Sequence, residues 1–409
     1  MKIRLFISLI FVLMVAACHT RYLVRPATAD DLQYSGKVEI RSTNSIPCFD
    51  SKAYIPRPED LKLRPMRQVK VNIHFMQNPD SVENYAGSTA IQYAHDLVDA
   101  INHDLETNAA MNLPAGNETP VLPTGYRIEL DPDHPNIFEH PDRDLYFYVH
   151  RGANANLYSK DVTRKYAVHA DSVINIFLMP HHPDSIRSKS YMNGATGITL
   201  GYSIKVAGLY ESGNPAYYFS GVTNHEIGHA LGLSHAWQGD PCDDTPNHPN
   251  CWENTGVPPC DGPISNNLMD YNPFQKAITP CQLGIVHRNL SRISSVRRKL
   301  LVPNWCALDT SRNLTIADTV IWDHEQDVTG NITIQPGGYL DIRCRTGMAK
   351  GAMISILPGG ILYMDGGYLH NSCGEEWQGI RILTDNKGNT GQIFTSDEGL
   401  LQDMMWKMD

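Results

Sequence analysis

The sequence predicts an α+β domain followed by a short all-β module, and three observations support this fold class. Residues 69–75 alternate apolar and polar side chains and are rich in β-branched residues, as a half-buried strand is. Residues 89–111 carry apolar or small side chains at helical spacing, which predicts a long amphipathic helix. Beyond Cys306 a strand-like motif recurs after 22 residues, which predicts stacked strands.

The rest of the α+β domain is predicted from shorter patterns. Three further segments rich in β-branched and aromatic residues are predicted as strands: residues 126–130, 145–149 and 173–179. Residues 193–209 are rich in glycine and are expected to form a loop with a short strand. Residues 220–231 are predicted as a helix that Ser220 or Thr223 would cap, and residues 283–301 as a later helix with an apolar stripe.

Length, charge and cysteine content limit the class of protein. A chain of 409 residues exceeds the usual size of one domain, so two domains are expected. The net charge is −10 and no dense basic patch is present, which argues against a nucleic-acid partner. Nine cysteines in a chain with an export signal predict disulfides formed in an oxidising compartment.

The first residues are predicted to be a targeting segment. Residues 1–17 are interpreted as a signal peptide, because a small positive region precedes an apolar run that is short for a membrane span. Small residues stand immediately before Cys18, which resembles the lipobox of bacterial lipoproteins, so we expect a lipid anchor on Cys18; ordinary cleavage near Ala17 is the alternative. The protein is therefore expected to be exported, as a cell-envelope lipoprotein or a secreted protein, and to contact a membrane only through Cys18.

The following residues, 18–66, are predicted to be a linker or pro-segment. They contain several prolines and show little periodic apolar pattern, so they offer no obvious face for a core. The α+β domain is then expected at residues 67–306 and the all-β module at residues 307–409.

The candidate metal ligands and general base lie in one stretch, residues 225–235. His225 and His229 are four residues apart, a spacing that places two imidazoles one turn apart on the same helix face. Gly232 permits a turn with positive φ, which would end the helix and bring back His235 as a third metal ligand. Three protein ligands leave one position open, as in catalytic zinc sites. Glu226 stands beside the first ligand, where it can deprotonate a metal-bound water.

The extended motif resembles a known group of enzymes. HEIGHALGLSH at residues 225–235, followed by NLMDY at residues 267–271, resembles the metzincin zinc endopeptidases and most of all the pappalysin family. The segment CDDTP at residues 242–246 strengthens the resemblance, which covers residues 67–306. It implies a mixed twisted sheet above an active-site helix, one zinc ion and a protein or peptide substrate. Met269 would form the Met-turn beneath the metal, and the Tyr271 hydroxyl would hydrogen-bond the oxyanion of the intermediate.

The same resemblance implies where substrate and calcium bind. The edge strand of the sheet would pair with an extended substrate, and residues 173–179 are our candidate for that strand. Asp243 and Asp244 would bind calcium, because hard cations take carboxylate oxygens and the family often carries calcium in this area. A solvated acidic turn or a cap formed by these aspartates is the alternative interpretation.

Cysteines complete the expectations from the resemblance. Cys48 would be a latency ligand on zinc, and its alternative is a disulfide, for example to Cys306; pairing among Cys48, Cys306, Cys344 and Cys373 would leave no odd thiol. The pappalysins imply Cys242–Cys260 and Cys251–Cys281. The short, equal gaps between the first three of these cysteines leave Cys242–Cys251 open.

The final hundred residues lie outside the resemblance. ITIQPGGYL at residues 332–340 recurs as ISILPGGIL at residues 354–362, and residues 377–382 resemble a further strand. A strand–PGG–strand unit with this period is typical of a β-solenoid, in which each coil buries its apolar face on the next.

Together these features predict a secreted or surface-anchored zinc metalloendopeptidase with Glu226 as general base. The alternative is a surface binding or adhesion protein in which the solenoid does the work and the peptidase domain is inactive. The presence of Glu226 argues against that alternative, because an inactive domain has no need of a general base.

Overall fold

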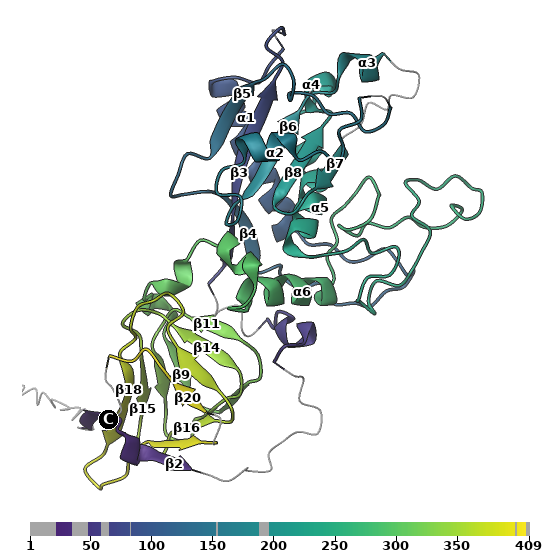
Figure 1. Ribbon diagram of the computed structural model, residues 1–409. Helices are drawn as coiled ribbons and strands as arrows, with labels where there is room; N and C mark the ends of the chain where they lie inside the picture. The colour runs from purple at the N-terminus through teal and green to yellow at the C-terminus, as the bar shows by residue number, and fades with distance from the viewer. Residues whose placement is uncertain are drawn as a thin grey trace, which may run out of the picture.

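The computed structural model describes residues 22–34, 48–58, 65–81, 83–152, 154–187, 196–396 and 399–405. The predicted signal peptide and Cys18 lie outside these residues. The described chain contains a part made of a sheet and helices, here the α+β part (within residues 65–306), and a part made of stacked strands, here the all-β module (within residues 307–405) (Figure 1). Each part has its own large buried apolar cluster.

A mixed sheet is the frame of the α+β part, with strand order β4–β3–β6–β8–β7. Its strands are β3 (Arg67–Gln77), β4 (Tyr126–Leu130), β5 (Ile137–Pro141), β6 (Ile174–Met179), β7 (Thr196–Thr199) and β8 (Ser203–Ala207). All pairs are parallel except β7 with β8, and β3 pairs with β4 along its first half and β5 along its second. Nearly every residue of β3 and β6 is buried, because helices and loops cover both faces.

One strand prediction was wrong, and another strand was predicted correctly but assigned to the wrong place in the sheet. Residues 145–149 form a turn with one isolated bridge at Tyr148, because the Asp142 side chain accepts the N–H groups of Asp144 and Leu145 and bends the chain there. The candidate edge strand, residues 173–179, lies in the sheet interior as β6, between β3 and β8. The edge is β7 instead, part of a hairpin within the segment expected to be mainly loop.

Three longer helices pack around the sheet: α1 (Ser88–Glu106), α5 (Ser220–Leu231) and α6 (Pro280–Ser291). The helix predicted at residues 283–301 is two elements, because Arg292 is extended and η5 (Val296–Leu300) begins after it; Ile293 and Val296, assigned to the apolar stripe, are exposed. Neither expected cap of α5 forms: the helix starts after Phe219, and the Thr223 hydroxyl donates back to the Phe219 carbonyl. Among the described residues, no helix is both long and apolar enough to cross a membrane.

Short helical turns complete the described part of the chain. They are η1 (Ala29–Asp31), η2 (Ser51–Tyr54), α2 (Asp161–Tyr166), α3 (Pro183–Ile186), α4 (Leu209–Ser212), η4 (Ala216–Phe219), η6 (Asn304–Cys306) and η7 (Thr310–Arg312).

The all-β module consists of three parallel sheets, and each set of three consecutive strands, here a rung, adds one strand to every sheet. The rungs are β9 (Leu314–Ile316), β10 (Thr319–Trp322), β11 (Gln326–Val328); β12 (Ile332–Ile334), β13 (Tyr339–Ile342), β14 (Arg345–Met348); β15 (Met353–Ile356), β16 (Ile361–Met364), β17 (Tyr368–His370); and β18 (Gly379–Thr384), β19 (Gln392–Thr395), β20 (Leu400–Leu401). Ile332 pairs with Ile354 and Tyr339 with Ile361, which is the 22-residue period seen in the sequence.

Residues 22–34 belong to this module. β1 (Leu23–Pro26) pairs antiparallel with β18 and β2 (Leu32–Tyr34) pairs parallel with β19, so they cover the outer edges of two of the three strands of the last rung. Figure 1 shows these purple strands against the yellow end of the chain. Both lie in the range predicted as a linker or pro-segment, and Ala27 between them is buried in the module core.

Cys48, Cys306, Cys344 and Cys373 pair completely, as their number predicted, but the example pairing of Cys48 with Cys306 was wrong. Cys48 is bonded to Cys344 and Cys306 to Cys373. A sulfur in a disulfide offers no thiolate to a metal, so the expectation of Cys48 as a zinc ligand is wrong for this structure. The bond instead ties the segment before the α+β part to the all-β module.

Candidate metal centre

Three histidines converge at the end of α5. His229 Nε2 lies 3.2 Å from His225 Nε2 and 3.1 Å from His235 Nε2. The turn that brings back His235 is made at Gly232, which has φ 103° and donates its N–H to carbonyls of the last helical turn. A glycine takes this conformation without steric cost. Three ring nitrogens that face a common point fit the donor set of a single zinc ion.

Main-chain carbonyls determine which ring nitrogen carries the proton in two of the histidines. His225 Nδ1 lies 2.8 Å from the Leu268 carbonyl and His229 Nδ1 lies 2.9 Å from the Leu233 carbonyl. A carbonyl only accepts, so each Nδ1 carries the proton and each Nε2 keeps its lone pair for a metal. Burial lowers the pKa of His225 to about 3 and that of His235 to about 4, so both rings are neutral near pH 7. The His235 ring is also held by stacking on Trp237, with centroids 3.9 Å apart.

Glu226 is buried against the edge strand. Burial raises the pKa of its carboxyl to about 7. Thr199 Oγ1, on β7, lies 2.7 Å from both Glu226 Oε2 and the Glu226 main-chain oxygen, so the hydroxyl fixes the carboxylate. A Cβ atom at Gly197, also on β7, would lie 2.7 Å from Glu226 Cγ. The strand can approach the carboxylate only because residue 197 has no side chain.

The predicted Met-turn lies beneath the histidines. Met269 is fully buried, and a Cβ atom at Gly228 of α5 would lie 2.5 Å from the Met269 sulfur. Asp270 is also fully buried; its Oδ2 accepts from Ser265 Oγ at 2.5 Å and lies 2.9 Å from His248 Nε2. Met269 therefore packs the turn against α5, and Asp270 ties the turn to Ser265 and to the loop that carries His248.

Tyr271 stands at the open side of the cluster. About half of its surface is exposed, and its ring centroid lies 5.8 Å from that of His225 and 5.1 Å from that of His235. Gln275 Nε2 donates to the Asp270 carbonyl at 3.1 Å, which ties the chain after Tyr271 back to Asp270 beside the histidines.

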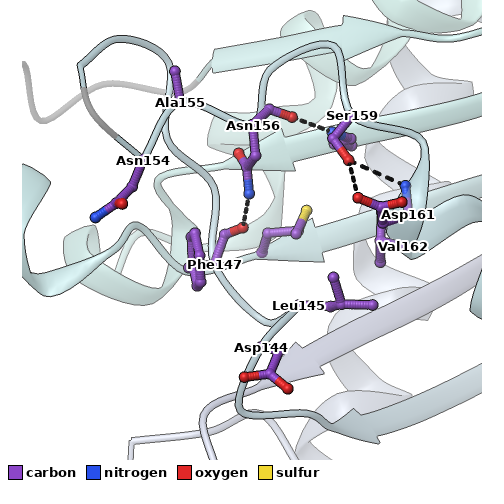
Figure 2. Close-up of a pocket in the computed structure, with 11 residues that line it drawn as sticks. Asp144, Leu145, Phe147, Asn154, Ala155, Asn156, Ser159, Asp161 and Val162 are labelled. Atoms are coloured by element: carbon purple, nitrogen blue, oxygen red, sulfur yellow. Dashed lines mark hydrogen bonds between the residues drawn. The ribbon is translucent and has the colours of Figure 1, made fainter.

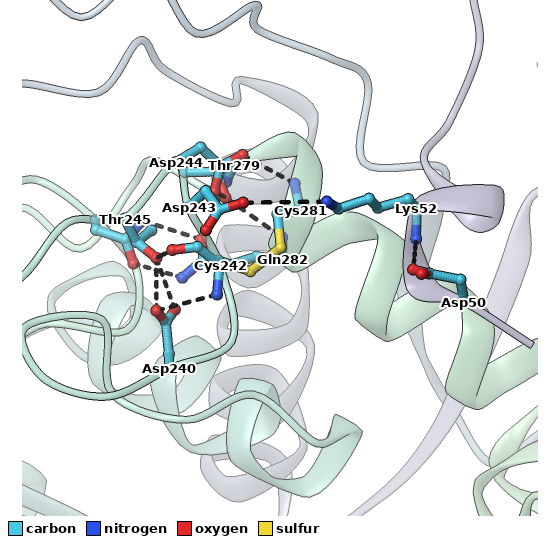
Figure 3. Close-up of a disulfide and its surroundings, with 11 residues drawn as sticks. Asp50, Lys52, Asp240, Cys242, Asp243, Asp244, Thr245, Thr279, Cys281 and Gln282 are labelled. Atoms are coloured by element: carbon cyan, nitrogen blue, oxygen red, sulfur yellow. Dashed lines mark hydrogen bonds and ion pairs between the residues drawn. A yellow bond between two sulfur atoms is a disulfide. The ribbon is translucent and has the colours of Figure 1, made fainter. Parts of the chain in front are cut away.

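The loop disulfides correct the pairing implied by the resemblance. The structure joins Cys242 to Cys281 and Cys251 to Cys260, in place of Cys242–Cys260 and Cys251–Cys281. Cys251 and Cys260 meet because the chain between them folds back on itself, with the Thr255 N–H donating to the Cys260 carbonyl. Cys242 meets Cys281 because the next residues dock on the start of α6 (Figure 3).

The two candidate calcium ligands have different roles in that docking. Asp244 accepts from Thr279 Oγ1 at 2.8 Å and from the Cys281 N–H at 3.0 Å, so both carboxylate oxygens serve the N-terminus of α6 (Figure 3). Asp243 points to solvent and has only a 4.0 Å contact with Lys52. This arrangement matches the alternative interpretation of a cap and a solvated turn.

A cavity of about 240 Å³ lies elsewhere in the α+β part (Figure 2). Its lining includes Asp144, Phe147 and Lys205. Lys205 alternates along β8 with Ile204 and Val206, which pack in the same core as α5, so the cavity lies on the other face of the sheet from the histidines. Lys205 Nζ donates to the carbonyls of residues 156 and 157, and burial lowers its pKa to about 8.

Several residues of the site were not found from the sequence: Gly197, Thr199, Gly228, Trp237, His248 and Gln275. Gly228 had a usable signal, since a glycine inside a helix is unfavourable and indicates close packing. Thr199 and Gly197 precede the motif by about thirty residues and belong to no pattern of their own, so only the fold brings them to Glu226.

Comparison with known proteins gives a distant structural similarity only. No protein-family profile matches the chain, and no curated protein matches it in sequence. Mature mirolysin of Tannerella forsythia, solved in complex with a cleaved peptide, is 16% identical with a TM-score of 0.42 over 58% of this chain and 96% of that chain. Mirolysin in complex with a compound is 18% identical with a TM-score of 0.41, over 57% and 96%. Similarity of this size assigns no role to any residue of this chain.

Proposed function

We propose that the protein is a zinc-dependent endopeptidase. The observation that carries this proposal is the convergence of three imidazoles beside a buried carboxylate and an edge strand. His225, His229 and His235 would hold the zinc, and their Nε2 atoms supply the donor set that a catalytic site uses. When bound, zinc would lower the pKa of a water and polarise the scissile carbonyl.

The chain itself supplies the proton transfers. The Glu226 carboxylate would accept the proton of the attacking water and deliver it to the leaving nitrogen. Thr199 holds Oε2 in place for both transfers. The Tyr271 hydroxyl would donate to the oxyanion, since its ring stands beside two of the histidines and is open to solvent.

The edge strand indicates an extended peptide as substrate. β7 pairs only with β8 among the strands that the structure describes, so its other edge can pair with another chain. Thr199 on this strand contacts Glu226, so a peptide aligned on β7 would lie near the general base. Pairing through main-chain hydrogen bonds would accept peptides of many sequences, and side-chain pockets would add a preference for particular residues.

A chelator test decides between peptidase and binding protein. We expect cleavage of an unstructured protein substrate by the full chain to stop with 1,10-phenanthroline and to return on adding zinc. His229→Ala should be inactive with or without added zinc, while His95→Ala, an exposed histidine on α1, should match the wild type. Cleavage that is absent in every sample, or unchanged by the chelator, would contradict the proposal.

Gly197→Ala should reduce activity without removing the metal. The added Cβ would displace the Glu226 side chain, and a displacement of about 1 Å in a catalytic group can cost on the order of 100-fold in rate. Zinc content should stay the same because no histidine moves. Gly262→Ala is the matched control, since its Cβ would meet nothing within 4 Å. Equal turnover of the two variants would show that β7 does not hold the base.

We also propose that the all-β module is a β-solenoid and that the protein is anchored through a lipid on Cys18. The 22-residue register between the second and third rungs supports the solenoid, and the small residues before Cys18 support the anchor. Cys18→Ala should move the protein from the membrane fraction to the soluble fraction of cells that express it. An unmodified N-terminus in the mass spectrum of the wild-type protein would contradict the anchor.

A further inference from the structure

A second set of metal-ligating side chains lies away from the three histidines. Asp131, His134 and His169 each offer one ligand atom, and these atoms all lie within 4.8 Å of one another. Asp131 and His134 follow β4, and His169 lies in the loop before β6. β4 is at one end of the sheet and β7, which contacts the candidate catalytic centre, is at the other. The two sites are therefore separate.

The sheet explains how the two loops meet. Val71 of β3 pairs with Leu130 on one side and with Ile174 on the other, so the loop after β4 begins, and the loop before β6 ends, at the same level of the sheet. The rings of His134 and His169 lie with centroids 4.3 Å apart and nearly perpendicular planes. Close rings in this arrangement can direct one nitrogen each to a shared ion without stacking face to face.

Asp131 is a buried carboxylate whose ionic partner among the described residues is an imidazole, which is charged only when protonated. Its side chain is 1% exposed, and among the described residues no lysine or arginine lies within 4 Å of its carboxylate. Oδ1 accepts the Asp133 N–H at 3.1 Å, and Oδ2 lies 3.3 Å from His134 Nδ1. A buried carboxylate without a cation is costly. An ion between this carboxylate and the two imidazoles would supply the missing charge, and the exposed rings leave it a path from solvent.

His169 occupies a backbone position that disfavours it. Its φ is 51°, in the left-handed region that suits glycine or asparagine. The Ser172 and Val173 N–H groups donate to its carbonyl at 2.9 Å and fix the turn. The turn itself does not require a histidine at this position. The backbone nevertheless places the His169 imidazole beside Asp131.

We propose that Asp131, His134 and His169 bind a second divalent transition-metal ion, such as zinc. Two imidazoles and one carboxylate suit zinc, cobalt or nickel, whereas calcium and magnesium take oxygen ligands. The ion ties the loop after β4 to the loop before β6 across β3. Because the exposed histidines leave ligand positions open to solvent, water completes its coordination. This site is independent of the proposed peptidase reaction.

Metal stoichiometry of the full chain tests this site. The protein is stripped of metal with a chelator, reloaded with zinc or cobalt and desalted. Its metal content per chain is then measured by inductively coupled plasma mass spectrometry. His134→Ala removes one exposed ligand, and His169→Asn removes the imidazole but suits the left-handed backbone, so both variants should fold. Each is expected to hold about one ion fewer per chain than the wild type and than the His95→Ala control.

Further variants keep this site distinct from the catalytic one. His229→Ala should also lose about one ion, and the double variant with His169→Asn should lose both. Peptidase activity of His169→Asn should remain near wild type, because β4 and β7 lie at opposite ends of the sheet. Equal metal content in the wild type, His134→Ala and His169→Asn would overturn the proposal, and so would an equal loss in His95→Ala.

Discussion

Replacing Glu226 with alanine is expected to lower peptidase turnover by about 10²- to 10⁴-fold or more while zinc stays bound. The three Nε2 atoms come from His225, His229 and His235, and two of these rings are oriented by main-chain carbonyls that the substitution does not touch. What is lost is the carboxylate that takes the proton of the water. The measurement is kcat on a fluorogenic peptide together with zinc content of the same sample.

Two companion variants sharpen this result. Glu226→Gln keeps the shape of the side chain and an oxygen for the Thr199 hydroxyl, but it cannot accept the proton, so it should be as inactive as the alanine variant. Glu118→Ala removes an exposed carboxylate in a loop and should leave turnover unchanged. Near wild-type turnover of Glu226→Ala would mean that another group is the general base and would contradict the proposed mechanism.

The parts of the fold that were predicted are those with local signals. Helix α5 and the positive φ of Gly232 follow from a motif of eleven residues, so the amino-acid sequence alone places the three histidines on one helix and the turn that ends it. Strand β4 has the predicted bounds, because a short β-rich segment is flanked by turn residues. The register of β12 with β15 and of β13 with β16 follows from the repeat alone, since similar units stack on one another.

The parts that were missed depend on distant contacts. β1 has four exposed residues and no alternating pattern, and it becomes a strand only because β18, near the other end of the chain, offers it an edge. The disulfide partners of Cys242 and Cys48 are likewise set by where loops dock, which cysteine spacing does not encode. β7 is the edge of the sheet through strand order, and strand order is a property of the whole α+β part.

A buried ion-pair network joins the two parts, and we expect its removal to have the largest effect on stability. Asp327 of β11 is 2% exposed. Its carboxylate lies 3.0 Å from Arg298 Nη2, 2.8 Å from Arg345 Nη2 and 3.8 Å from Arg67 Nη1. Arg345 belongs to the all-β module, whereas Arg67 lies on β3 and Arg298 on η5 of the α+β part. One carboxylate therefore holds three guanidinium groups from both parts.

Asp327→Ala should lower the free energy of unfolding by about 3–5 kcal/mol, because it leaves several buried guanidinium groups without their shared counter-charge. Asp327→Asn should be nearly as damaging, since the lost charge matters more than the lost volume. The exposed Asp318→Ala, in the first rung, is the matched control and should stay within about 0.5 kcal/mol of wild type. Urea unfolding at pH 7 measures all three. A loss below about 1 kcal/mol for Asp327→Ala would show that the network does not hold the parts together.

The pH dependence of the stability difference between wild type and Asp327→Ala shows whether lost charge or lost packing causes it. Burial alone would raise the pKa of Asp327, but the three guanidinium groups outweigh burial and hold this pKa well below its usual range. A carboxyl with a lowered pKa in the folded state contributes its full stability above its unfolded pKa of about 4, and that contribution is lost as the pH falls toward the folded value. The gap between wild type and Asp327→Ala should therefore be constant from about pH 5 to pH 8 and should narrow below about pH 4. A cavity or packing defect would leave the gap unchanged with pH, so a constant gap at low pH would assign the loss to packing instead of charge.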